Sequence, residues 1–175
     1  MVQLHPPPPD EPLMTVRTIL AVFVMIRAMI KLNLAICSSA SFYSDVITFS
    51  YKLEDLGINI ILPNTAAKMK AEGGKNNEAN TDWSKTAIDY YGKSALIRGH
   101  FDEIARSDAI LVTNYEKHNI ANYIGPNVLM EMAIAFYLKK PIYILNGQPK
   151  DSPLIDEILG LEPIFLDGDI KSIKF

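Results

Sequence analysis

The sequence predicts an α/β fold, a five-stranded parallel sheet that is doubly wound and flavodoxin- or Rossmann-like, with strand order 2-1-3-4-5. Short apolar segments alternate along the chain with longer helical segments, which is the pattern of repeated strand–helix–strand units. In the first unit, Gly57 ends the helix and Pro63 closes the second strand. Such a unit forms a right-handed parallel crossover.

Each predicted strand is a short apolar run that ends at polar residues, a proline or a glycine. The expected strands cover residues 32–37, 58–62, 109–113, 141–145 and 163–166. The expected helices cover residues 42–56, 84–106, 126–138 and 152–159. Residues 64–83 are polar and predict a long loop, which in a compact domain is typical of a lid or a mobile segment.

Composition narrows the function classes. The chain has 175 residues, of which 49% are hydrophobic, and a net charge of −3, which argues against a nucleic-acid polymer as partner. Cys37 is the single cysteine, so one chain can form no disulfide, and we expect a reducing, cytoplasmic compartment. No cofactor is expected. No metal ligands are expected either, because no His/Cys/Asp cluster has metal-ligand spacing along the sequence.

Residues 1–30 differ from the rest, so we expect an N-terminal extension over 1–30 and a single domain over 31–175. The extension contains a polyproline run and then an apolar run over residues 19–26. That run is shorter than the about 20 residues needed to span a bilayer, so no membrane partner is expected. A helix lying on a membrane surface is the alternative for this segment.

Glu131 is the one residue in 128–138 that is neither apolar nor aromatic. A surface helix carries a polar stripe, yet only Asn127 is polar among the residues one turn from Glu131. We therefore expect Glu131 in a buried helix, near the end that opens to solvent. Burial of a lone carboxylate is costly or raises its pKa. This predicts a catalytic or ligand-binding carboxylate, with a glutamate that braces a neighbouring loop as the alternative.

Ligands of doubly wound sheets bind at the carboxyl ends of the strands where the strand order reverses, here between the first and third strands. The loop after the first strand has serine hydroxyls at a helix N-terminus, suited to a phosphate or a sugar hydroxyl, or only to helix capping. The candidate binding residues at this crevice are Ser38, Ser39, Ser41, Tyr43, Asn114, Gly125 and Asn127. Asn114 and Asn127 have ordinary alternatives as a turn residue and a helix cap. His100 is expected to be a half-buried packing residue on its helix.

Several motifs together resemble one family. They are Leu-Gly-Ile at 56–58 with Leu-Pro at 62–63, Ser-Asp-Ala-Ile-Leu-Val at 107–112, a Gly-x-x-x-x-x-Glu-x-x-x-Ala helix that begins with Gly125, and Lys-Pro-Ile at 140–142. The pattern resembles the nucleoside 2-deoxyribosyltransferase-like superfamily, which includes deoxynucleoside 5′-monophosphate N-glycosidases. The resemblance covers about residues 31–166.

The resemblance implies cleavage or transfer at the N-glycosidic bond of a 2′-deoxynucleoside or its 5′-monophosphate. In the family, the helix glutamate attacks C1′ of the deoxyribose, and Glu131 matches that position. The loop over residues 38–41 matches the family loop that contacts sugar or phosphate. The implied partner is a small-molecule nucleoside or nucleotide, and the implied assembly is a homo-oligomer.

Two positions depart from the family pattern. Transferases of the family have an aspartate after the third strand, and this chain has Asn114 there. Before the helix, the transferases have Gly-Thr, and this chain has Gly125-Pro126-Asn127. An aspartate helps protonate the leaving base, so Asn114 weakens the case for transfer. A non-catalytic nucleotide- or nucleotide-sugar-binding module of the same fold is the alternative function.

Overall fold

Residues 15–29, 31–73 and 90–174 are described by the computed structural model. Contacts divide the chain into two units, Met1–Lys31 and Leu32–Phe175. Helix α1, Val16–Met29, belongs to the first unit. Among the described residues, no helix has both the length and the apolar character needed to cross a membrane.

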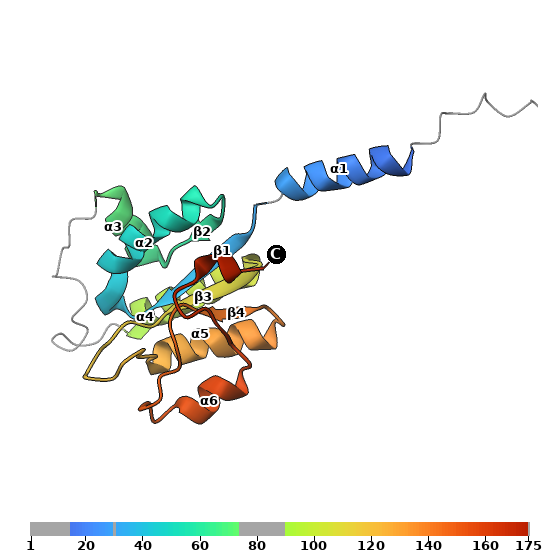
Figure 1. The fold of residues 1–175 in the computed structure, drawn as a ribbon. Helices are drawn as coiled ribbons and strands as arrows, with labels where there is room; N and C mark the ends of the chain where they lie inside the picture. The colour runs from blue at the N-terminus through green and yellow to red at the C-terminus, as the bar shows by residue number, and fades with distance from the viewer. Residues whose placement is uncertain (1–14, 30, 74–89, 175) are drawn as a thin grey trace, which may run out of the picture. The chain divides into compact units, whose positions relative to one another are not determined.

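The second unit is built on a five-stranded sheet in which every pairing is parallel and the order is β2-β1-β3-β4-β5, as the sequence predicts (Figure 1). The strands are β1 Asn33–Ser38, β2 Asn59–Ile61, β3 Ala109–Thr113, β4 Ile142–Ile144 and β5 Ile164–Phe165. The helices are α2 Tyr43–Asp55, α3 Asn64–Ala71, α4 Tyr90–Arg106, α5 Pro126–Tyr137 and α6 Ile155–Gly160, with 3₁₀ turns at Ala40–Phe42 and Ile170–Ser172.

Side-chain alternation along the strands produces two hydrophobic cores, one on each face of the sheet. Leu34 and Ile36 of β1 pack in the core covered by α2 and α3. Ala35 and Cys37 point the other way, into the core covered by α4, α5 and α6. Figure 1 shows these two helical layers on opposite sides of the sheet. Buried on both faces, the central strands are continuous apolar runs, as expected for a parallel sheet.

Two glycines have structural reasons for their positions. Gly57 has a φ of +80°, which a glycine adopts without strain, and it follows the C-terminal end of α2 as predicted. Gly125 precedes Pro126 at the start of α5, and a Cβ there would lie 3.0 Å from the Tyr123 hydroxyl oxygen. Gly125 thus permits the close approach of Tyr123 to the start of the helix.

The loop prediction for residues 64–83 is wrong in its first part, because Asn64–Ala71 forms α3. The segment contains Ala66, Ala67, Lys68 and Met69, which favour helix, and Ala66 is fully buried in the core beside α2. The polar composition of this segment indicates that it is exposed to solvent, and it does not indicate that the segment lacks secondary structure. Residues 74–89, which hold the rest of the predicted loop and the predicted start of the next helix, lie outside the described residues.

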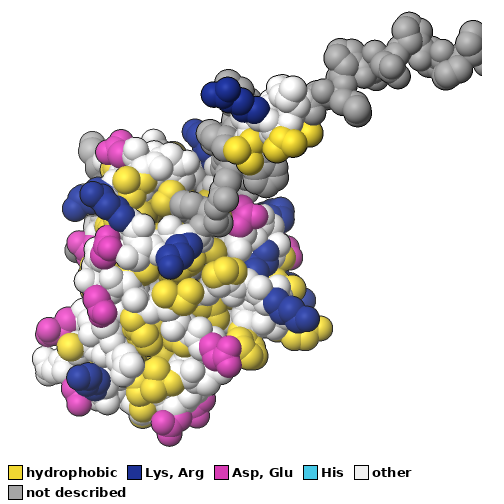
Figure 2. Space-filling model, turned by 45° about the vertical axis from the view of Figure 1, so that its right-hand side comes forward, with side chains coloured by type: hydrophobic (Ala, Val, Ile, Leu, Met, Phe, Trp, Pro, Cys, Tyr) yellow, Lys and Arg dark blue, Asp and Glu magenta, His cyan; other side chains and the backbone are white. Residues whose placement is uncertain are grey.

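The prediction that the α5 helix is buried is correct for one face only. Met132 and its neighbours pack on the sheet, but Met130, Phe136 and Tyr137 are 42%, 47% and 81% exposed. Helices form the outer layers of this architecture, so a second face of α5 meets solvent in the single chain. Figure 2 shows hydrophobic side chains that reach the surface between charged ones on the face in view.

Candidate active site

Glu131 lies in the second turn of α5, on the side that faces α4. Its side chain is only 16% exposed. The nearest basic group is His100 on α4, whose Nε2 lies 3.7 Å from Glu131 Oε2, within ion-pair distance but too far for a hydrogen bond. Oε2 is buried and has no hydrogen-bond partner in the described part of the chain. The predicted lone acid among apolar neighbours is therefore shielded from bulk solvent.

Burial dominates the electrostatics of this carboxyl. It raises the pKa of Glu131 to about 7, and the positive charge that His100 carries when protonated lowers the pKa part of the way back. Burial likewise raises the pKa of the Cys37 thiol and raises that of the Tyr43 hydroxyl to about 12. Tyr43 is thus a neutral hydrogen-bonding group at physiological pH, whereas Glu131 exchanges between its charged and neutral forms.

His100 is the centre of a small polar cluster between the sheet and the two helices. Its Nδ1 lies 2.7 Å from Glu103 Oε2, one turn further along α4. Its Nε2 lies 3.8 Å from Cys37 Sγ on β1. The ring is buried, so these contacts fix the orientation of its nitrogens relative to Glu131.

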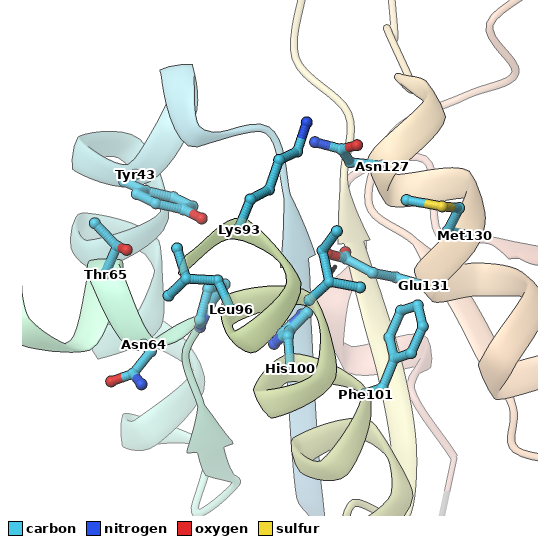
Figure 3. Close-up of a pocket in the computed structure, with 12 residues that line it drawn as sticks. Tyr43, Asn64, Thr65, Lys93, Leu96, His100, Phe101, Asn127, Met130 and Glu131 are labelled. Atoms are coloured by element: carbon cyan, nitrogen blue, oxygen red, sulfur yellow. Dashed lines mark ion pairs between the residues drawn. The ribbon is translucent and has the colours of Figure 1, made fainter. Parts of the chain in front are cut away.

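Beside this cluster is a pocket of about 160 Å³ between α2, α3, α4 and α5. Figure 3 shows Glu131 of α5 beside His100 of α4, with Tyr43 pointing in from α2 and Lys93 of α4 extending toward Asn127. The pocket is lined by Tyr43, Pro63, Asn64, Thr65, Lys93, Leu96, Ile97, His100, Phe101, Asn127, Met130 and Glu131. The mixture of apolar walls and a few polar groups is typical of small-molecule sites.

A second cavity, of about 360 Å³, shares Glu131, Tyr43 and Asn127 with the first and extends to the loop after β1. In this cavity the Lys117 Nζ donates hydrogen bonds to the hydroxyl oxygens of Ser39 at 3.1 Å and Ser41 at 2.9 Å. A cation, two hydroxyls and the start of a helix therefore meet at one end of the cavity, with the carboxyl of Glu131 also in its lining.

Most of the predicted site residues lie together around the two cavities. Ser39, Ser41, Tyr43 and Asn127 line them, as do Ser38, which is itself buried, and Gly125. Asn114 does not line either cavity. It is fully buried, donates to the carbonyl oxygen of Gly147 at 3.0 Å and accepts from the backbone N–H of Asn146 at 2.9 Å. Its amide holds the loops after β3 and β4 together.

Three residues of the site have no role in the sequence-based prediction. Lys117, His100 and Cys37 reach Glu131 or the serine loop only through the fold, at separations such as 78 residues between Lys117 and Ser39. The left-handed residues His118, Asn119 and Asn122 shape the loop that carries Lys117. One pattern in the sequence could have drawn attention to His100. The spacing of His100 and Glu103 puts both side chains on one face of the helix.

Comparisons with solved structures found several likenesses. No protein-family model matches the sequence, and no curated protein matches it. A 2-deoxyribosyltransferase from Bacillus psychrosaccharolyticus has a TM-score of 0.40 at 12% identity, over 64% of this chain and 70% of that one. The CMP N-glycosidase BcmB from Clostridium botulinum has a TM-score of 0.41 at 12% identity, over 77% of this chain and 88% of that one.

At this identity, neither likeness assigns a substrate or a catalytic residue to the chain, so any function must be argued from its own side chains.

Proposed function

We propose that this protein cleaves or transfers at the N-glycosidic bond of a 2′-deoxynucleoside 5′-monophosphate or the corresponding nucleoside, with Glu131 as the nucleophile. The observation that carries the proposal is the Glu131 carboxyl, buried, with Oε2 unpaired among the described residues, in the lining of two cavities. A carboxylate in such a place is costly to the fold, and it can trap the oxocarbenium-like centre that forms as a glycosidic bond breaks.

The chemistry has two steps. A carboxylate oxygen of Glu131 bonds to C1′ while the C1′–N bond breaks, and the base leaves with the bonding electron pair and takes up a proton. Water, or a second base in a transfer reaction, then adds to C1′ and releases the carboxylate. Glu131 must be ionised to attack, and the ionised form is favoured by a protonated His100 at 3.7 Å.

Lys117 favours the monophosphate over the nucleoside. Its ammonium group and the hydroxyls of Ser39 and Ser41 lie at the N-terminal end of α2, where backbone N–H groups also favour an anion. A nucleotide whose sugar lies at Glu131 would place its 5′-phosphate toward this group. The cavity that holds Lys117 and the serines also contains Glu131.

The first test measures release of free base by chromatography, with the four deoxynucleosides and their 5′-monophosphates, in a buffer that contains a chelator. We expect the Glu131→Gln variant to lose activity by about a thousandfold or more, because the amide is a poor nucleophile. Glu157→Gln, which changes an exposed acid on α6, is the matched control. Equal activity in Glu131→Gln would remove this residue from the mechanism, and tight binding of a nucleotide without turnover would select the binding-module alternative.

The second test addresses the phosphate. We expect Lys117→Ala to raise the KM for a 5′-monophosphate by about 10- to 100-fold, because a hydrogen bond from a charged donor contributes about 1.5–3 kcal/mol. The KM for the nucleoside should stay unchanged. Lys171→Ala, at an exposed lysine near the C-terminus, is the control. A parallel loss for nucleoside and nucleotide would contradict a phosphate role for Lys117.

A further inference from the structure

Three side chains with metal-ligating atoms converge at the side of the smaller pocket, each from a different element. They are Cys37 from β1, His100 from α4 and Glu131 from α5, and one ligand atom of each lies within 4.8 Å of the other two. The His100 Nε2 is 3.8 Å from Cys37 Sγ and 3.7 Å from Glu131 Oε2. Because these residues are far apart in the sequence, ligand spacing along the chain does not reveal the cluster.

We propose that Cys37, His100 and Glu131 bind a divalent cation of the zinc class. Zinc bonds to sulfur, nitrogen and oxygen ligands at about 2.0–2.3 Å, so neighbouring ligand atoms in a tetrahedral site lie about 3.3–3.8 Å apart. The two distances at His100 Nε2 agree with this separation. The third pair, Cys37 and Glu131, has ligand atoms within 4.8 Å of each other.

Glu103 prepares the histidine for this role. At 2.7 Å, its carboxylate accepts a hydrogen bond from His100 Nδ1–H, and this tautomer of the neutral ring has its lone pair on Nε2, the atom that faces Cys37 and Glu131. A carboxylate behind a ligating histidine is a common feature of zinc sites, where it fixes the tautomer and raises the basicity of the ligand. Glu103 is therefore a positioning residue in this proposal.

The unpaired oxygen is the second observation that points to a ligand. Glu131 Oε2 is buried, yet nothing in the described part of the chain donates a hydrogen bond to it. Cys37 is completely buried beside it. A cation between the two would satisfy the oxygen, and the carboxylate and thiolate together would balance the charge of a divalent ion. Binding releases the thiol proton to solvent.

The ligand set also limits which ions fit. Sulfur and imidazole ligands favour zinc and its neighbours cobalt and nickel, whereas magnesium and calcium prefer oxygen ligands alone. His100 and Glu131 both line the pocket of about 160 Å³, so a fourth coordination position opens toward space that can hold water. The protein would thus supply three ligands to the metal ion and leave one coordination position open.

Metal binding has a consequence for the proposed reaction, and this consequence rests on the proposed function. A carboxylate that coordinates zinc is a weaker nucleophile toward C1′, because the cation withdraws electron density from it and fixes its position. We therefore expect zinc to inhibit base release and a chelator to restore it. The binding itself does not depend on any catalytic activity.

The test is optical and uses the full chain. Cobalt(II) is added to chelator-treated, desalted protein, and the near-ultraviolet thiolate-to-cobalt charge-transfer band is followed. We expect the band to saturate at a single equivalent and zinc to displace it, while magnesium has no effect. Cys37→Ser should abolish the band. Glu103→Gln, which keeps all three ligands, should weaken affinity about 10- to 100-fold. His118→Asn changes an exposed histidine in the left-handed region, which asparagine tolerates, and should bind like the wild type.

Absence of the band in the wild type, or its retention at full affinity in His100→Gln, would overturn the metal site. Circular dichroism of each variant checks the fold, and Glu103→Gln and His100→Gln decide the matter should Cys37→Ser fail to fold. Excess zinc should also raise the Tm of the wild type but not of His100→Gln. A protein that binds cobalt but releases no base with any substrate contradicts the proposed function alone, whereas one that releases base but binds no cobalt contradicts the metal site alone.

Discussion

Burial of the Glu131 side chain favours the neutral form of its carboxyl. Its raised pKa, of about 7, means that the folded protein holds this proton more tightly than the unfolded chain does. Stability from this group is fully present below the pKa of the unfolded glutamate. It is lost as the pH rises through the folded value near 7.

The corresponding prediction concerns the free energy of unfolding, measured by urea titration with a chelator present. Relative to Glu131→Gln, the wild type should lose about 2–3 kcal/mol of stability between pH 5 and pH 8, because only the wild type must ionise a buried carboxyl. Glu157→Gln, at an exposed position, should follow the wild type at both pH values. A constant difference between Glu131→Gln and the wild type across this range would contradict a raised pKa.

At the scale of single residues, the sequence identifies Glu131 through its pattern, because one acid interrupts an apolar helical run. It does not identify His100 or Lys117 as members of the site. Their partners come from other elements, and no periodicity connects a lysine in a loop with a serine 78 positions earlier. The same limit explains why Asn114, at the end of β3, is predicted in the crevice but bonds between two loops instead.

Helix α5 links the site to the core at the scale of elements. Its three faces have different environments, since Met132 packs on the sheet, Glu131 meets α4 and Met130 is partly exposed. The apolar sequence of the helix predicts burial all round, but an outer helix of a three-layer fold packs one face on the sheet. The exposed apolar face is compatible with the homo-oligomer that the sequence resemblance implies, which stays a prediction.

Two methionines of α5 provide a matched test of this arrangement. Met132→Ala should lower the free energy of unfolding by about 2–5 kcal/mol, because it leaves a cavity in the core, whereas Met130→Ala should cost less than about 1 kcal/mol. Both can be measured by chemical denaturation. Comparable losses for the two variants would contradict the orientation of the helix and would place Met130 in an interface or a core.

For the whole molecule, the division at Lys31 and Leu32 predicts an independent domain. Both hydrophobic cores are made of residues from the second unit. A chain that begins at Lys31 should therefore unfold cooperatively, with a Tm within a few degrees of that of the full chain, and should retain base release. Calorimetry of the two proteins tests this, and loss of cooperative unfolding in the shorter protein would contradict the proposed boundary.

The sequence by itself determined the fold class, the strand order and the position of Glu131, because these follow from local patterns of apolar residues, glycines and prolines. Only the tertiary structure decided which groups surround the carboxyl. Cys37, His100 and Glu131 belong to three elements, and Lys117 to a loop, so their meeting depends on how the layers pack around the sheet. Packing is a property of the whole chain, and a linear pattern does not encode the distances that it sets.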